Sequence, residues 1–256
     1  MSVNPLAPHR LHEPHKVSTL LGPLLPCGTP QTRMVGIMAL NGSAAVEGSS
    51  GSMGSAADAR LLTELREWSD AVLVSAATVR TEGYRPMSLP DDLRLRREHD
   101  GRPSLPRLAI LTPSLSLEPS SEVLGAPLEA PPLVISTVPA TDRKEHAARR
   151  RALEQAGAEV LLLRSLSPRV VLCALREAGY ARISVEGGPS LYSRVLAEDV
   201  VDILHLSLDP HMPTHCALPL VDAAGEREAS RRYTPEAVAA DAEGVLFLRY
   251  RRARGV

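Results

Sequence analysis

The sequence is poor in aromatic residues, which make up 3% of its 256 positions and include one Trp and one Phe. A hydrophobic core must therefore be built from aliphatic side chains, and the 44% hydrophobic content supplies enough of them. Dense aliphatic strands are typical of a parallel sheet that is covered on both faces. The length allows one large α/β domain or two small ones.

Other absences exclude whole classes of protein. The 29 basic and 30 acidic residues give a net charge of −1, so the positive excess of a nucleic-acid binder is missing. No apolar run approaches the roughly 20 residues of a membrane helix, and the N-terminus lacks a signal-peptide pattern. We therefore expect a cytoplasmic protein with neither a nucleic-acid partner nor a membrane partner.

Cysteine is scarce and scattered, with no C-x-x-C pair. The three are Cys27, Cys173 and Cys216. We expect free thiols in a reducing compartment. Two histidine groups raise the question of a metal: His211-x-x-x-His215-Cys216, and His9, His12 and His15. Neither group completes a ligand set, so we predict no metal. A P-loop, a G-x-S-x-G elbow and an H-E-x-x-H motif are also missing, and nothing favours a hydrolase or a phosphotransferase.

What the sequence does contain is an alternation of strand and helix patterns. Strands are predicted at Arg33–Leu40, Asp70–Ser75, Arg107–Leu111, Leu133–Ser136, Glu159–Leu163 and Arg182–Val185, and helices at Ala59–Ser69, Arg143–Ala156, Arg169–Ala178 and Ser190–Leu196. This order predicts right-handed crossovers and a mostly parallel α/β sheet with helices on both faces. Strands Val201–Leu208 and Val245–Tyr250 have no helix between them, so an antiparallel C-terminal edge is expected.

Two segments fall outside this alternation. Residues 1–32 are rich in proline, which excludes a long helix or a central strand, and they are predicted to be an arm or irregular cover before a domain at 33–256. Gly83–Pro106 is charged and is predicted to be a solvated loop too polar for the core. Arginines in or near this loop could meet a substrate phosphate: Arg85, Arg94, Arg96 and Arg97.

The most informative turn is Ser184-Val-Glu-Gly-Gly-Pro-Ser-Leu191, where a strand ends in an acid and a helix begins after two glycines. Ligands of open α/β sheets bind at such strand ends. Gly187 and Gly188 permit close approach, and the helix N-terminus suits an anion such as a cofactor diphosphate. The spacing fits a plain tight turn equally well, with Pro189 at the first helical position and Ser190 in the first turn.

Two further strand ends carry small or polar residues. Ser75-Ala76-Ala77-Thr78 leaves room for a nucleotide, and Thr78 could donate to a phosphate or a carboxamide, or simply begin a helix. Asn41, in Ala39-Leu40-Asn41-Gly42, could orient an amide or occupy a left-handed turn position.

In this order the segments resemble the reductase domain of riboflavin biosynthesis, the C-terminal half of a bifunctional deaminase-reductase, in a stand-alone form. The resemblance covers about residues 33–250 and is carried by Ala39-Leu40-Asn41-Gly42, the Gly/Ser stretch 49–54, Asp58, Ser75-Ala76-Ala77-Thr78-Val79-Arg80 with Glu82-Gly83-Tyr84, Val185-Glu-Gly-Gly-Pro-Ser-Leu191 and Val201-Asp202-Ile203-Leu204. No deaminase is implied, because the zinc-binding cysteine pair of deaminases is missing.

The resemblance implies a dihydrofolate-reductase-like fold, a homodimer, NADPH as hydride donor, and a 5-amino-6-ribosylamino-pyrimidine 5′-phosphate whose ribose is reduced to ribityl. It places Asn41 and Glu186 at the reacting centre. The residues that it assigns to NADPH are Asp58, Ser75, Ala76, Ala77, Thr78, Gly187, Gly188, Pro189 and Ser190.

Three departures from the family pattern keep alternatives open. Asn41 replaces a strand-end Asp, Ser75 and Ala77 replace glycines, and Asp209-Pro210-His211-Met212 lacks the usual Ala-Pro followed by Gly-Gly. An amide cannot exchange a proton as a carboxylic acid does. The chain is accordingly a pyrimidine reductase, a reductase of the same fold redirected to another imine- or pterin-like substrate, or a catalytically degenerate homologue.

Overall fold

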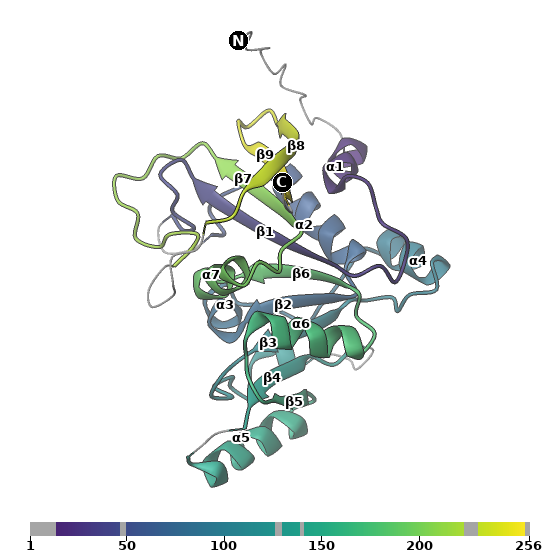
Figure 1. Cartoon of the computed structure of the whole chain (residues 1–256), viewed down its shortest axis with the longest axis vertical. Coiled ribbons are helices and arrows are strands. Elements are labelled where there is room, and N and C mark those ends of the chain that lie inside the picture. Colours follow the sequence, from purple (N-terminus) through teal and green to yellow (C-terminus); the bar gives the residue numbers. More distant parts are fainter. Residues whose placement is uncertain (1–13, 47–49, 126–129, 139–140, 223–229, 254–256) are drawn as a thin grey trace.

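The computed structural model describes residues 14–46, 50–125, 130–138, 141–222 and 230–253, and within them nine strands form one sheet in the order β5-β4-β3-β2-β6-β1-β7-β9-β8 (Figure 1). The strands are β1 (Gln31–Ala39), β2 (Ala71–Ser75), β3 (Arg107–Leu111), β4 (Leu133–Thr137), β5 (Glu159–Leu163), β6 (Arg182–Gly187), β7 (Ile203–Asp209), β8 (Tyr233–Ala240) and β9 (Leu246–Arg252). Every pairing from β5 to β7 is parallel, whereas β9 runs antiparallel to both β7 and β8. The predicted mostly parallel sheet with an antiparallel C-terminal edge is confirmed.

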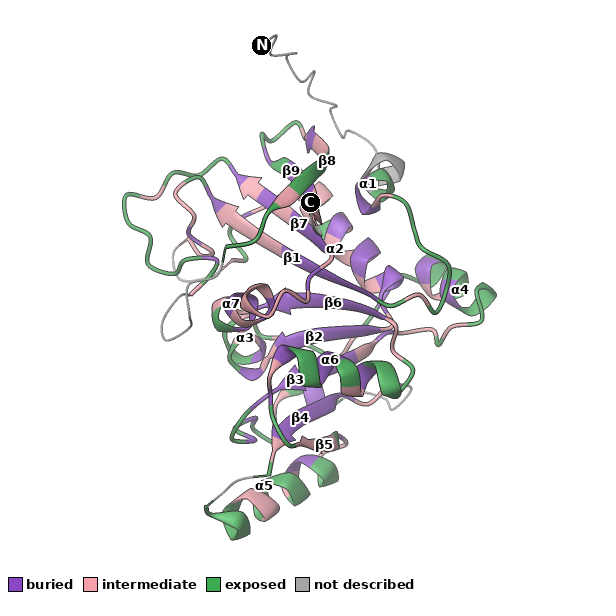
Figure 2. Cartoon of the chain, in the orientation of Figure 1, coloured by how far each residue is buried: buried purple, intermediate pink, exposed green. Residues whose placement is uncertain are grey.

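Helices cover both faces because strand residues alternate between two cores. The helices are α1 (Pro14–Leu21), α2 (Ala56–Trp68), α3 (Ala76–Thr81), α4 (Asp91–His99), α5 (Arg143–Gln155), α6 (Pro168–Glu177) and α7 (Pro189–Ala197), with a 3-10 turn at Glu122–Leu124. Leu73 of β2 packs with α6 and α7, whereas its neighbours Val72 and Val74 pack with α3 and α5. Figure 2 shows the buried strands between helices whose outer surfaces are exposed.

Strand β8 was not predicted. It carries Pro235 and Glu236, is exposed over Thr234–Glu236, and shifts register between Pro235 and Ala237. Proline is tolerated at a sheet edge because no ladder hydrogen bond is needed on the open side. The pattern of an edge strand is therefore too polar to stand out from a loop.

The prediction that residues 83–106 form a solvated loop was wrong. Helix α4 lies within this segment, and both Leu93 and Arg97 are buried. The many charged residues of α4 hide its buried face in the sequence. Arg97 can be buried because its guanidinium group is hydrogen-bonded within the protein. The proline-rich N-terminal segment likewise contains a short helix, α1, whose Leu20 and Leu21 pack on the core formed with α2.

The start of α2 also differs from the prediction. Asp58 lies in the first turn of the helix rather than before it, and the N-cap is Ser55, whose hydroxyl accepts a hydrogen bond from the Asp58 amide. Ser55 directly follows the Gly/Ser stretch 49–54, which hides the cap in the sequence. Ser49 of that stretch lies outside the described residues.

Candidate active site

The three predicted ligand turns meet at one edge of the molecule. In the sheet order β2, β6, β1 and β7 are neighbours and run parallel, so their carboxyl ends lie side by side. Helices α3 and α7 begin at this edge and pack on opposite faces of the sheet. A ligand crossing the edge would meet all three turns.

The turns after β2 and β6 form what we call the Gly188 cradle: Ser75, Thr78, Gly187 and Gly188. The Ser75 and Thr78 hydroxyl oxygens lie 2.9 Å apart, and Ser75 Oγ accepts from the Thr78 amide at 3.1 Å. A Cβ atom on Gly188 would lie 2.6 Å from Thr78 Oγ1, and Gly187 has a φ of +130°. Only glycine fits at either position without a shift, and the hydroxyls lie directly against bare backbone.

Helix α7 begins at the cradle with its first turn uncapped by any described side chain. Pro189 occupies the first helical position, and Ser190 is exposed. The first-turn amides of a helix have no partner within the helix, and together with the helix dipole they attract an anion. Bare backbone, two hydroxyls and a free helix start together fit the phosphate and amide groups of a nicotinamide dinucleotide.

The other residues assigned to the cofactor are placed differently. Ala76 is 4% exposed and its methyl group packs in the core under α3, whereas Ala77 is exposed. Asp58 lies on α2 and accepts a hydrogen bond from the hydroxyl of Ser207 on β7, two strands beyond β6. Burial raises the pKa of Asp58, the Ser207 hydrogen bond opposes that shift, and the charge of Asp209 adds to it.

Glu186 is held in an internal ion pair. Its carboxylate accepts three hydrogen bonds from Arg66 at 2.7, 2.9 and 3.2 Å and one from Tyr84 at 2.9 Å, and its side chain is 1% exposed. Burial and the neighbouring carboxylate raise the pKa of Tyr84, so the phenol keeps the proton that it donates. This network fastens β6 to α2 and to the segment after α3.

Asn41 lies at the end of β1 and is fastened to what we call the crossing segment, residues 210–222 after β7. Its amide donates to the Pro213 carbonyl at 2.9 Å, and its own carbonyl accepts from the Ser43 amide at 3.0 Å. The crossing segment then reaches α7, where the Asp222 amide donates to the Pro189 carbonyl at 3.4 Å. Asn41 therefore lies between the end of β7 and the Gly188 cradle.

Asp209 and His211 were not predicted as site residues. Asp209 pairs in register with Ala39 at the end of β1 and is 2% exposed. Burial acts to raise its pKa, but hydrogen bonds from the Gly54 amide and from both the backbone and the ring of His211 outweigh burial, and the pKa lies below its usual value. The sequence signal for this pair was the departure from the family pattern at Asp209-Pro210-His211-Met212. We interpreted that departure as the loss of a family motif and not as its replacement by other site residues.

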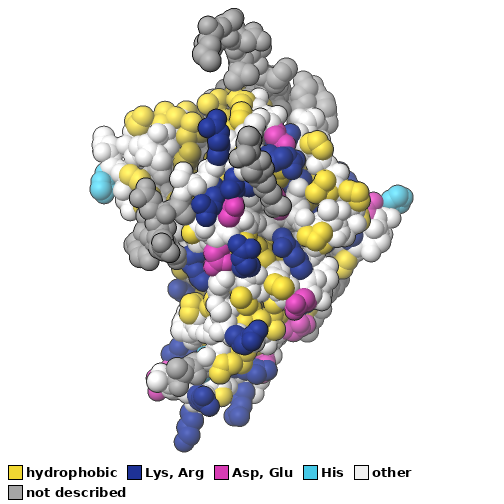
Figure 3. All heavy atoms as spheres, in the orientation of Figure 1, with side chains coloured by type: hydrophobic (Ala, Val, Ile, Leu, Met, Phe, Trp, Pro, Cys, Tyr) yellow, Lys and Arg dark blue, Asp and Glu magenta, His cyan; other side chains and the backbone are white. Residues whose placement is uncertain are grey.

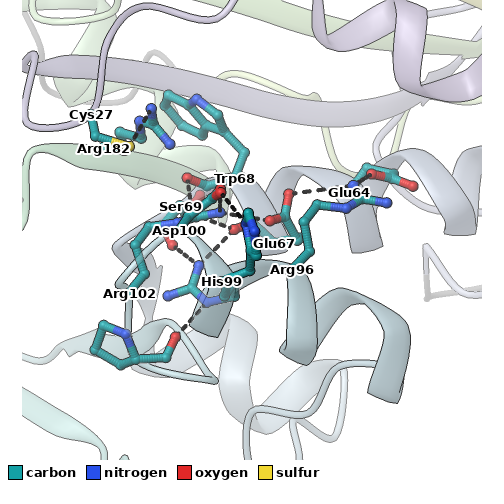
Figure 4. Close-up of polar contacts among 12 residues, drawn as sticks. Cys27, Glu64, Glu67, Trp68, Ser69, Arg96, His99, Asp100, Arg102 and Arg182 are labelled. Atoms are coloured by element: carbon teal, nitrogen blue, oxygen red, sulfur yellow. Dashed lines mark hydrogen bonds and ion pairs between the residues drawn. The ribbon is translucent and has the colours of Figure 1, made fainter.

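The arginines considered for a substrate phosphate are engaged elsewhere. Arg97 is 1% exposed and donates to the carbonyls of Glu67 and Ser69, both at 2.6 Å. Arg96 contacts Glu64 at 3.2 Å, and Figure 4 shows it beside the Arg102 and Glu67 pair. These contacts fasten α4 to α2. Arg85 forms an exposed ion pair with Glu122, and Arg94 also has a partner.

The remaining predictions concern cysteines, metals and membranes. Cys27, Cys173 and Cys216 are exposed free cysteines in the structure. Within the described ranges no three His, Cys, Asp or Glu side chains are grouped to hold a metal; His9 and His12 lie outside those ranges. No described helix has the length and apolarity to cross a bilayer.

Basic and acidic side chains are interspersed on the face in Figure 3, with basic ones concentrated around α5.

A mostly parallel sheet with an antiparallel C-terminal edge and ligand turns at the carboxyl ends places the protein in the dihydrofolate-reductase-like α/β class. The model of the RibD C-terminal domain family matches residues 30–215. The chain belongs to this family.

Comparisons with individual proteins agree with this assignment. A solved pyrimidine reductase-like protein of Corynebacterium diphtheriae is 34% identical, with a TM-score of 0.86 over 93% of this chain and 99% of that one. The 2,5-diamino-6-ribosylamino-4(3H)-pyrimidinone 5′-phosphate reductase of Archaeoglobus fulgidus is 28% identical over 157 residues, which are 60% of this chain and 67% of the relative. Acinetobacter baumannii RibD shares the fold, with a TM-score of 0.68 at 19% identity over 89% of this chain and 59% of its own.

Proposed function

We propose that the protein is an NADPH-dependent reductase of the riboflavin pathway. Its substrate is a ribosylamino-pyrimidine 5′-phosphate, whose ring-opened ribose is reduced to a ribityl chain. The nicotinamide supplies a hydride when bound, and the protein contributes mainly by positioning the two reactants.

The observation that carries the proposal is the Gly188 cradle in a chain of this family. A cofactor diphosphate would lie on the bare backbone of Gly187 and Gly188 and on the first turn of α7. The hydroxyl of Thr78, held by Ser75, would then face the cofactor at the junction of the two turns. Glu186 holds this arrangement in place through Arg66 and Tyr84.

Calorimetric titration with NADPH and, separately, NADH tests the cofactor assignment. We expect tight binding of NADPH, followed by its oxidation when the amino-ribosylamino-pyrimidine phosphate is added. Failure to bind either dinucleotide would contradict the proposal and favour a degenerate homologue. A change of Gly187 to Val should abolish binding, because a side chain at a φ of +130° strains the turn against which the diphosphate lies.

A second candidate is a reductase of the same fold acting on another imine- or pterin-like compound. Asn41 favours it, because this amide is fixed by Pro213 and Ser43 at the place where the family resemblance leads one to expect an acid. Binding of NADPH without turnover of the riboflavin intermediate would select this candidate.

We further propose that the protein is a cytoplasmic homodimer. In the part of the chain that the structure describes, strand β8 ends the sheet and pairs with β9 on one side only, so its outer edge is open to a second copy. Sedimentation at several protein concentrations tests the assembly, and a monomer at all of them would refute it.

A further inference from the structure

We propose that His211, oriented by Asp209, is a further catalytic residue that supplies the proton in the reduction. The inference rests on the proposed function, because it assigns a donor to a step of that reaction. It concerns the substrate side of the site, which the Gly188 cradle leaves undefined.

The geometry of the pair leaves one ring nitrogen available. The buried carboxylate of Asp209 binds Nδ1 of His211 and also accepts from the His211 amide at 3.0 Å and the Gly54 amide at 2.8 Å. The His211 side chain is nevertheless 59% exposed, whereas that of Asp209 is 3% exposed. With Nδ1–H donated to the carboxylate, Nε2 is the nitrogen that can meet a ligand.

The pair is positioned at the active-site edge by backbone contacts. The Leu40 amide donates to the His211 carbonyl at 2.9 Å, two residues before the Pro213 carbonyl that accepts from Asn41. The crossing segment, which contains His211 and directly follows Asp209, continues past β1 to Pro189 at the start of α7. His211 and the Gly188 cradle are thus two ends of one connected edge.

Two other acidic groups in the described part of this edge are already engaged. Glu186 is locked by Arg66 and Tyr84, and Asp58 is buried with the Ser207 hydroxyl on its carboxylate. Asn41 has no proton to exchange. A group that holds a proton, faces outward and is oriented by a carboxylate is found at His211.

The chemical step balances with His211 as the acid. The carbon of the substrate C=N bond accepts the hydride, and the π electron pair of that bond moves to the nitrogen. The nitrogen would take the proton from Nε2 of the His211 imidazolium and become an amine, with the hydride and its electron pair supplied by the bound NADPH, which is thereby oxidised to NADP⁺. His211 is then neutral and regains a proton from water before the next turnover.

Three variants of the full-length protein test the assignment: His211→Gln, Asp209→Asn and the control His215→Gln. His215 lies in the same crossing segment and is exposed, and it has no part in the proposed step. We expect His211→Gln to lower kcat about 100-fold with the KM for NADPH unchanged, since a positioned acid contributes on that scale. Asp209→Asn should lower kcat less, and His215→Gln should leave it unchanged.

Chemical rescue separates catalysis from a structural role. Imidazole in solution should restore part of the kcat of His211→Ala and leave the control unaffected. If His211→Gln keeps kcat within about threefold of wild type, the inference is overturned, while normal NADPH oxidation by the wild type leaves the proposed function standing.

A binding measurement keeps the inference testable should turnover be absent. The NMR signals of the His211 ring, assigned with His211→Gln, should shift when the ribityl pyrimidine phosphate is added. Unchanged ring signals in the presence of bound pyrimidine would overturn the inference, and failure of NADPH to bind would separately overturn the proposed function.

Discussion

The two ends of the parallel strands differ in the polar groups that they leave open to a ligand. At the amino ends, two buried arginines find their contacts within the protein: Arg33 lies 4.2 Å above the Trp68 ring, and Arg97 donates to backbone carbonyls. At the carboxyl ends, the Gly188 cradle offers backbone and hydroxyls, and His211 is exposed. A buried charged side chain with hydrogen-bond partners inside the protein stabilises the fold. An exposed polar side chain beside bare backbone is available to bind a ligand.

The largest effect should come from breaking the amino-end cluster. Arg97→Met would leave the carbonyls of Glu67, Ser69 and Pro103 without their shared donor, and we expect a loss of about 3 kcal/mol in the free energy of unfolding. Urea unfolding measures it. The matched control is Arg85→Met, whose ion pair with Glu122 is 80% and 72% exposed and should contribute less than about 0.5 kcal/mol.

The same variants separate the two ends of the sheet functionally. Arg97→Met should bind NADPH with wild-type affinity under conditions where it is folded. A loss of NADPH or substrate affinity in a stably folded Arg97→Met protein would place this arginine in a ligand site and refute the comparison.

An intermediate effect is expected at the carboxyl ends. Gly188→Ala puts a Cβ atom 2.6 Å from Thr78 Oγ1, so the Thr78 hydroxyl must move from its place in the cradle. We expect the Kd for NADPH to rise at least about tenfold, or about 1.4 kcal/mol. Calorimetry checks this.

The control for this change is Gly125→Ala, where an added Cβ would lie 3.5 Å from the Glu122 carbonyl in ordinary contact. It should bind NADPH as the wild type does. Equal affinity in Gly188→Ala would mean that the cofactor does not use the cradle.

How much of this the sequence could predict depends on whether the signal is local. The alternation of aliphatic strands and amphipathic helices is local, and it correctly indicated the parallel sheet and its antiparallel edge. The turn that ends at Gly188 was visible for the same reason, because glycines and a helix start follow directly after a strand. Strand β8 was hidden, since Pro235 and Glu236 are permitted only by its edge position.

What could not be predicted are contacts between distant segments. Glu186 looked free to meet a ligand, but its partners Arg66 and Tyr84 lie 120 and 102 positions away in the chain. Arg97 was predicted to lie in a solvated loop or to meet a substrate phosphate for the same reason. The role of Asp209 likewise depends on β7 lying beside β1, a pairing that no local pattern specifies.

The dependence of folding stability on pH also distinguishes the two ends of the sheet. His205 of β7 is 1% exposed, and burial, with the charges of Arg33 and Arg249, lowers its pKa well below the ordinary 6.5. Below pH 6.5 His205 binds a proton in the unfolded chain but not in the folded chain, so the free energy of unfolding falls as the pH drops. At about pH 5.5 this amounts to about 1.4 kcal/mol.

His205→Leu should remove that part of the decline in urea unfolding between about pH 7.5 and 5.5, while His99→Leu, at a side chain 90% exposed, should keep the wild-type decline. Asp209 at the other end has a lowered pKa, so its contribution is present above the ordinary 3.8 and is lost only in more acidic solution. The two ends therefore lose stability in separate pH windows. An unchanged decline in His205→Leu would show that the buried histidine is not the group that titrates.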